Sequence, residues 1–176
     1  MEAAEALARP DTADCPSYYA RYVERVPEGD ILNQLESQLD GTLGLLGGLD
    51  ETRANFRYAP GKWSIKDIVL HLSDTERVFA ARLLHFGRRD PAPLPGFEQD
   101  DYVVVARADE RRLADLLWEL EAVRGATMAL CRGLPHEEWR ARGTASGVEF
   151  SAHALPWIMA GHELHHRAVI EERYLS

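Results

Sequence analysis

With 176 residues, 45 % of them apolar, the chain is long enough for one domain with a substantial core. Its formal net charge is −9 and no run of Lys and Arg gathers in one place, which disfavours nucleic acid and anionic membrane surfaces as partners. The sequence has no stretch with the length and apolarity of a membrane span, and its first residues lack the pattern of a signal peptide, so we expect a cytoplasmic protein.

Residues 1–27 have the composition of an N-terminal arm rather than of a domain. They contain three prolines and mixed polarity, with Tyr18, Tyr19 and Tyr22 as the only evident anchors. We therefore place the single domain at residues 28–176. Two cysteines, Cys15 and Cys131, are too few for a disulfide framework.

Apolar residues recur at helical spacing in four later segments. The expected helices cover about residues 30–49, 64–87, 109–131 and 151–174. Ser64 followed by Asp67 is an acidic variant of the capping box, which predicts the start of the second helix. Three prolines and a glycine lie within residues 88–101, which predicts a long crossover loop between the second and third helices.

Residues 136–150 lie before the last expected helix and carry Gly143 and Gly147, a pattern that allows a small hairpin. Ser151 can cap the helix that follows, although Pro156 in its early turns would remove one backbone hydrogen bond. The sequence thus predicts an all-α fold: a four-helix bundle with one long crossover loop, and a small hairpin before the last helix.

Three of the seven histidines crowd into the last helix, at His162, His165 and His166. Residues four apart lie on the same face of a helix, so His162 and His166 can converge on one ion, and His162 with His165 is the competing pair. At about 100° per residue, His166 falls about 20° from the centre of the apolar face and His165 about 80° from it. Helical phase therefore favours His162 and His166.

A single buried histidine is ordinarily satisfied by hydrogen bonds. Two stacked in one apolar stripe are harder to satisfy in that way, because each imidazole needs polar partners, and a shared metal ion serves both at once. Such a pair still needs a third ligand. His71 on the second helix is the candidate, but its phase places it at the edge of the buried stripe and leaves its role open.

The run from Tyr58 to Arg77, YAPGKWSIKDIVLHLSDTER, resembles the segment that carries the first metal-binding histidine in the DinB-like (YfiT-like) family. The run Gly161–Arg167, GHELHHR, resembles that family's last-helix motif, and the resemblance covers about residues 30–176. It implies a four-helix bundle, frequently a homodimer, that binds one divalent ion through His71, His162 and His166. Many members continue the last motif with Gly-Gln after the arginine, whereas Ala168 and Val169 follow here.

Three imidazoles suit zinc, nickel, iron or manganese, and they leave a coordination position open for water or for a thiol. The resemblance implies a metal-dependent thiol S-transferase that uses a low-molecular-weight thiol, or a hydrolase, acting on a small molecule. A protein that binds its metal for structure or sensing, without turnover, is the alternative. Asp74, one turn from His71, is our candidate for a catalytic base.

Overall fold

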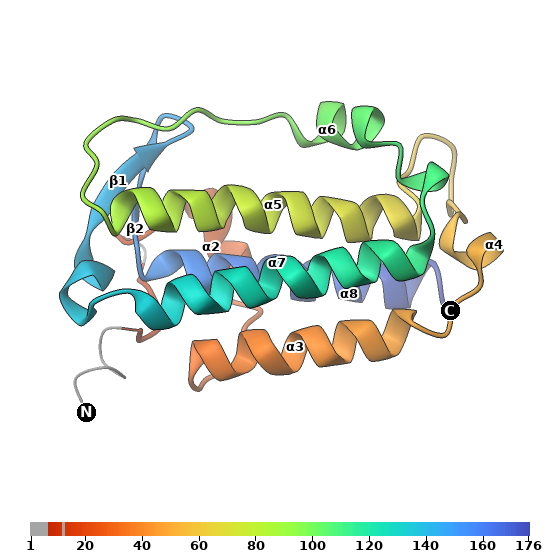
Figure 1. Ribbon diagram of the computed structural model, residues 1–176, viewed down its shortest axis with the longest axis horizontal. Helices are drawn as coiled ribbons and strands as arrows, with labels where there is room; N and C mark the ends of the chain where they lie inside the picture. The colour runs from red at the N-terminus through yellow and green to blue at the C-terminus, as the bar shows by residue number, and fades with distance from the viewer. Residues whose placement is uncertain (1–6, 12) are drawn as a thin grey trace.

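Four long helices form a bundle, which the computed structural model describes over residues 7–11 and 13–176 (Figure 1). They are α3 (Ile31–Leu46), α5 (Ile65–Phe86), α7 (Leu113–Gly133) and α8 (Ala154–Arg173). Both α3 and α5 contact α7 and α8, and a single turn, α4 (Glu51–Ala54), connects α3 to α5. The predicted four-helix bundle is confirmed.

The helices α5 and α7 run in the same direction, so the chain between them returns along the whole bundle (Figure 1). This crossover contains α6 (Gln99–Ala106) and the short 3₁₀ helix η1 (Ala108–Glu110), and α7 starts at Leu113 rather than at the predicted position 109. The sequence did not predict α6. None of its residues is buried and three of them are consecutive valines, so the segment has no apolar stripe to detect.

The predicted hairpin is present, after a short 3₁₀ helix, η2 (His136–Arg140). Strands β1 (Arg142–Ala145) and β2 (Val148–Ser151) pair antiparallel. Ser146 and Gly147 between them have φ angles of 54° and 75°, as a two-residue type I′ turn requires. The Leu94 N–H donates to the carbonyl of Thr144 at 2.9 Å, which attaches the crossover to the hairpin.

The two predicted helix starts have different outcomes. At α5 the capping box is present, because Ser64 and Asp67 each accept the other's backbone N–H. At the last helix the prediction of a Ser151 cap is wrong. Ser151 ends β2 and donates to the carbonyl of Asp14, while α8 begins at Ala154. Pro156 therefore stands in the first turn, where no intrahelical N–H bond is lost.

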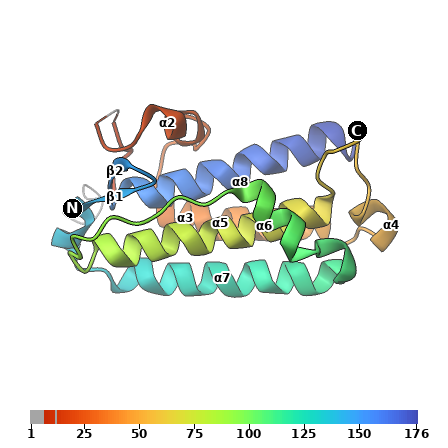
Figure 2. The ribbon, with the colours of Figure 1, turned by 90° about the horizontal axis from the view of Figure 1, so that it is seen from above.

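Part of the expected N-terminal arm folds as a helix, α2 (Ser17–Val23), and packs across α8 (Figure 2). The approach is close enough to require glycine at position 161, since a Cβ there would lie 1.9 Å from the carbonyl oxygen of Tyr22. The domain boundary at residue 27 stays a prediction, although α2 covers one side of the bundle.

The core consists of two apolar clusters, one toward each end of the bundle. Between them every bundle helix contributes buried polar side chains: Thr42 of α3, His71 and Glu76 of α5, Arg124 of α7, and His162 and Glu163 of α8. Such groups are rarely buried without a partner, so this polar layer needs hydrogen bonds, ion pairs or a ligand inside the bundle.

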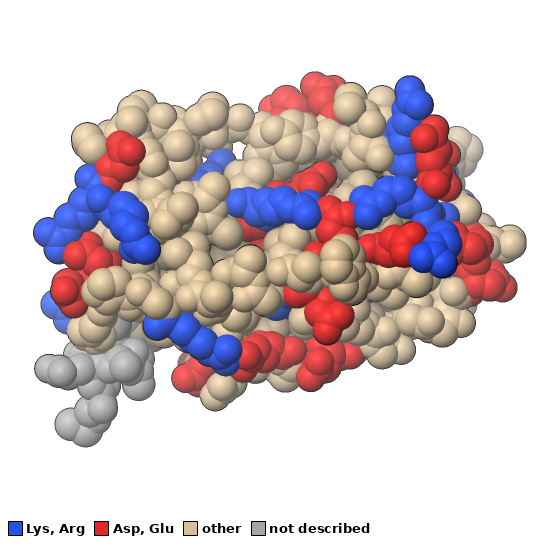
Figure 3. All heavy atoms as spheres, in the orientation of Figure 1, with Lys and Arg blue, Asp and Glu red and all other residues tan. Residues whose placement is uncertain are grey.

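The surface is mixed in charge. On the face shown in Figure 3, basic and acidic side chains are interspersed rather than gathered by sign. None of the described helices has both the length and the apolarity that a membrane-spanning helix needs.

Candidate metal centre

Three histidines from two helices meet in the polar layer. His71 comes from α5, and His162 and His166 come from successive turns of α8. The Nε2 atom of His162 lies 3.0 Å from that of His71 and 3.1 Å from that of His166, and one ring nitrogen from each residue lies within 4.8 Å of the others. The structure therefore brings together the three residues that the sequence singled out.

His71 is only 3 % exposed, although its phase predicted the edge of the buried stripe. Every residue from 65 to 73 of α5 is buried, because α5 is packed against α6, α7 and α8 together. The edge of the stripe thus faces α8. His165 lies outside the cluster, half-buried, with its ring 5.6 Å from that of Tyr22.

The two short distances from His162, to His71 and to His166, suit a shared metal ion better than they suit hydrogen bonding. Nitrogens that bind one ion at about 2.0–2.1 Å, with angles between square and tetrahedral, are about 2.9–3.4 Å apart. By contrast, the Nε2 of a neutral imidazole has either one N–H or one lone pair, so His162 cannot form a good hydrogen bond with both His71 and His166. An ion at the centre would use all three lone pairs at once.

The electrostatic environment keeps these imidazoles neutral, which is the form that binds metal. Burial lowers the pKa of His71 to about 4. Burial, and after it the neighbouring histidines, lowers the pKa of His162 and of His166 well below the usual value. Protons would therefore not compete strongly for the three nitrogens near neutral pH.

Neighbouring side chains hold the rings in place. The Thr75 hydroxyl lies 3.3 Å from Nδ1 of His71, one turn along α5, where it can fix the tautomer that leaves Nε2 free. The Trp63 ring lies 4.7 Å from that of His71, and the Tyr22 ring packs edge-on against His162 at 5.4 Å. These aromatic side chains pack directly against two of the three histidines.

Two solvent-connected cavities adjoin the histidines. One, of about 310 Å³, lies between α2 and the crossover and has His162 in its wall. The other, of about 330 Å³, has Trp63 and His166 in its wall. Both are within the range of small-molecule sites. Asp100, in the first turn of α6, lines both, so this helix stands between the two openings.

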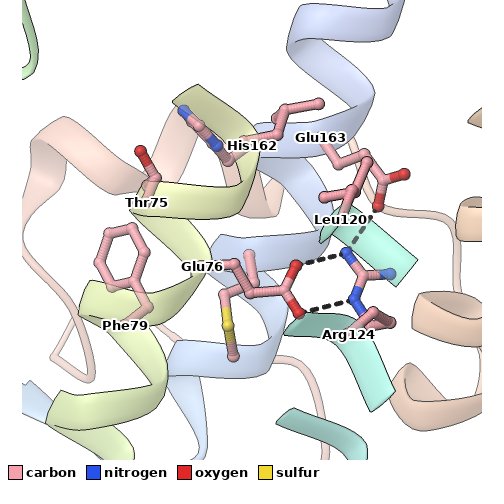
Figure 4. Close-up of a pocket in the computed structure, with 9 residues that line it drawn as sticks. Thr75, Glu76, Phe79, Leu120, Arg124, His162 and Glu163 are labelled. Atoms are coloured by element: carbon pink, nitrogen blue, oxygen red, sulfur yellow. Dashed lines mark hydrogen bonds and ion pairs between the residues drawn. The ribbon is translucent and has the colours of Figure 1, made fainter. Parts of the chain in front are cut away.

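A buried ionic cluster lies directly beside the histidines, and the sequence reading did not predict it. Arg124 donates to both carboxylate oxygens of Glu76 at 2.8 Å and to Glu163 at 2.9 Å (Figure 4). It also donates to the carbonyl of Leu35, and Thr42 donates to Glu163 at 2.6 Å. The position of Arg124 in the sequence could have indicated its burial. It lies four residues from Leu120 and four from Met128, within the apolar stripe of its helix.

Asp74, our candidate base, is placed beside the charged surface of α5. Its carboxylate accepts from Arg77 at 3.2 Å, and Arg77 also pairs with Glu119 of α7 at 2.7 Å. Burial raises the pKa of Asp74. Among the described residues, the side chain that hydrogen-bonds to His71 from α5 is that of Thr75 and not that of Asp74.

Fold and site together define a helical bundle with a candidate metal centre between α5 and α8. The family model of the DinB superfamily matches residues 34–170, which is most of the chain. The chain therefore belongs to the DinB superfamily, as its motifs predicted.

Solved structures show the same architecture. One is YfiT from Bacillus subtilis, described as a probable metal-dependent hydrolase with an unusual four-helix bundle topology. It is 15 % identical, with a TM-score of 0.68 over 93 % of this chain and 89 % of that one. Another is a mycothiol-dependent maleylpyruvate isomerase, 13 % identical, with a TM-score of 0.67 over 82 % of this chain and 61 % of that one. At such identities the likeness is one of fold. The curated proteins contain no match to this chain.

Proposed function

We propose that this protein is a metal-dependent enzyme that acts on a small molecule, as a thiol S-transferase or a hydrolase, with one divalent ion held by His71, His162 and His166. The observation that carries the proposal is the convergence of three imidazole nitrogens within 4.8 Å, one of them on His162 in the wall of a cavity of about 310 Å³. A divalent ion at this position would supply Lewis-acid activation of a water or a thiol.

The chain's own residues support turnover better than simple storage of a metal. Only imidazoles, with no fourth protein ligand, converge among the described residues, which leaves room for an exchangeable ligand. The cavity beside His162 is open to solvent and large enough for a small molecule. The similar structures, described as a hydrolase and as a thiol-dependent isomerase, support this range of reactions.

Elemental analysis tests the metal site. We expect the wild type to contain about one divalent ion per chain, and the His162→Ala/His166→Ala variant to contain almost none. His165→Ala is the matched control, because His165 is on the same helix but its ring lies outside the cluster, and it should retain the metal. Equal metal in all three proteins, or none in the wild type, would refute the site. The same measurement identifies the ion among zinc, nickel, iron and manganese.

Turnover separates an enzyme from a protein that binds metal for structure or sensing. The metal-loaded protein is assayed for transfer of a low-molecular-weight thiol to a small electrophile and for hydrolysis of small esters and amides, with and without chelator. We expect one of these activities, abolished by the chelator and by His162→Ala/His166→Ala. A metal-loaded protein without either activity would favour the non-catalytic alternative.

Two finer points stay predictions. If Asp74 is a catalytic base, Asp74→Asn should lower turnover while the metal content is unchanged, and unaltered turnover would remove that role. The homodimer that the family resemblance implies is tested by light scattering on the purified protein.

A further inference from the structure

The ionic cluster of Glu76, Arg124 and Glu163 contains one guanidinium and two carboxylates, so its formal net charge is −1. All three residues are at most 5 % exposed. Among the described residues, each carboxylate forms its only ion pair with Arg124. A net charge in a protein interior is costly unless an opposite charge is near, so the second carboxylate calls for a further cation.

The cluster lies close to the candidate metal ligands on both helices. Glu163 follows His162 on α8, and Glu76 follows Thr75, whose hydroxyl contacts His71. A small cavity of about 10 Å³, near the minimum for one water molecule, is lined by His162 and by all three charged residues (Figure 4). The charged groups and His162 therefore share the wall of one small cavity, whose remaining lining is mostly apolar.

The histidine cluster, for its part, lacks negative charge. Its convergent ligand groups are three imidazoles, which bind a metal ion in their neutral form, and no carboxylate or thiolate is among them. A divalent ion bound to them would bring two positive charges into the core without any charge compensation from its ligands. The net negative charge of the ionic cluster would thus offset part of the positive charge of the ion.

We propose that the Glu76–Arg124–Glu163 cluster is the buried counter-charge of the metal ion, and that its uncompensated carboxylate raises the affinity of the three histidines for a divalent cation. This inference rests on the proposed metal site. Glu76 and Glu163 act here as positioning and charge-compensating residues. They do not bind the ion themselves, since the group of convergent ligand atoms contains only the three histidines.

The competing explanation is that the cluster only joins helices. Arg124 contacts α3, α5 and α8 from α7, so a purely structural role is physically reasonable. The two explanations differ in what should follow from neutralising one carboxylate without changing its shape. If the role is only structural, the metal affinity of a variant should fall only as far as its folding stability falls. If the cluster is a counter-charge, the metal affinity should fall even in a variant whose folding stability is unchanged.

Glu163→Gln is the decisive variant, because it removes one charge and preserves size. Its amide oxygen can accept from Arg124 and its amide nitrogen can donate to Thr42, so the hydrogen bonds at this position are retained. Glu76→Gln is an independent second test of the same charge. We expect each variant to bind Zn²⁺ about 10-fold more weakly than the wild type or worse, the usual effect of losing a group behind a metal ligand.

Two controls separate charge from packing. Thr42→Val removes a hydrogen bond to the same Glu163 carboxylate without changing charge. Lys66→Met breaks a different ion pair, that of the buried Lys66 with the exposed Glu51 at 2.6 Å, outside the histidine cluster. Zn²⁺ affinity is measured by competition with a chromophoric chelator at one neutral pH, and the unfolding midpoint of each metal-free protein is measured alongside. Both controls should bind Zn²⁺ within about threefold of the wild type, whatever their midpoints.

Wild-type affinity in both glutamine variants would overturn the counter-charge proposal, and so would an equal loss of affinity in Thr42→Val. If one glutamine variant does not fold, the other decides. A wild-type protein that binds no Zn²⁺ or Ni²⁺ at all would instead refute the three-histidine site itself, so the two failures are distinguishable.

Discussion

The Nε2 atoms of His71 and His162 lie 3.0 Å apart although the two residues are 91 positions apart in the chain. This contact exists only because α5 packs against α8, and two features of the molecule support that packing. The ionic cluster around Arg124 connects α5, α7 and α8 from within the core, and α2 covers the outer side of α8. Substitutions in the ionic cluster or between α2 and α8 should therefore change the positions of the histidines.

Gly161→Ala should destabilise the protein and disturb the site. A Cβ at this position would lie 1.9 Å from the carbonyl oxygen of Tyr22, and because that atom belongs to the backbone, α2 must move away. We expect the free energy of unfolding to fall by about 1–3 kcal/mol in urea denaturation, as in other overpacked interiors. The matched control is Gly125→Ala in α7, where nothing lies within 4 Å, and it should gain up to about 1 kcal/mol from helix propensity. Equal stability of the two variants would show that α2 is not held against α8.

Two buried arginines should respond oppositely to replacement by methionine. Arg124→Met leaves two carboxylates buried without their cation, so we expect a loss of about 3–5 kcal/mol in the free energy of unfolding. Arg82 is 1 % exposed, and among the described residues its Nε and one terminal nitrogen have no hydrogen-bond partner. Arg82→Met loses one bond to Ser146 but removes an unpaired buried charge. It should leave stability within about 1 kcal/mol of the wild type or raise it. A loss at Arg82 as large as that at Arg124 would contradict this assignment.

The sequence could predict those parts of the site that depend on a single helix, but not those that depend on how two helices pack. The choice of His162 and His166 over His165 needed only the phase of one helix, and the structure brings those two together. The position of His71 needed the packing of α5 against α8, which its own stripe does not encode. The expectation that His71 is the third ligand came instead from the family resemblance.

The buried charges could not be predicted by a rule that treats charged side chains as solvated. Glu76 and Arg124 occupy positions inside apolar stripes, and only their pairing across helices makes that burial tolerable. Similarly, α6 has no buried residue and so no periodic signal, although its Asp100 lines both cavities beside the histidines. In both cases the missing information was how the helices pack against one another, which the residue pattern of a single segment does not show.

Tyr174 should make stability depend on pH in the alkaline range. Its hydroxyl donates to the carbonyl of Trp63 at 2.6 Å, and burial raises the pKa of Tyr174 to about 12 from the model-compound value of 10.0. Between these values the folded chain holds a proton that the unfolded chain has lost. The stabilisation is therefore fully present below pH 10 and is lost as the pH rises through about 12, by up to about 1.4 kcal/mol per pH unit.

Tyr174→Phe should abolish that alkaline dependence and cost about 1 kcal/mol at neutral pH through the lost hydrogen bond. Urea denaturation at a series of pH values measures both effects. Tyr102→Phe, at an exposed position of α6, is the control and should retain the wild-type slope. An unchanged slope in Tyr174→Phe would mean that another group causes the alkaline loss.

Neither cysteine should react in the folded protein. Cys15 and Cys131 are 6 % and 2 % exposed, and burial raises the pKa of both thiols, that of Cys131 to about 12. Because the thiolate is the reactive form, native protein treated with iodoacetamide at neutral pH should show no added mass, and protein treated in guanidinium should show two additions. Modification of native Cys131 would contradict this. If it holds, a thiol-transfer reaction at the histidine centre must take its sulfur from a separate small molecule, and Cys131→Ala should transfer thiol as the wild type does.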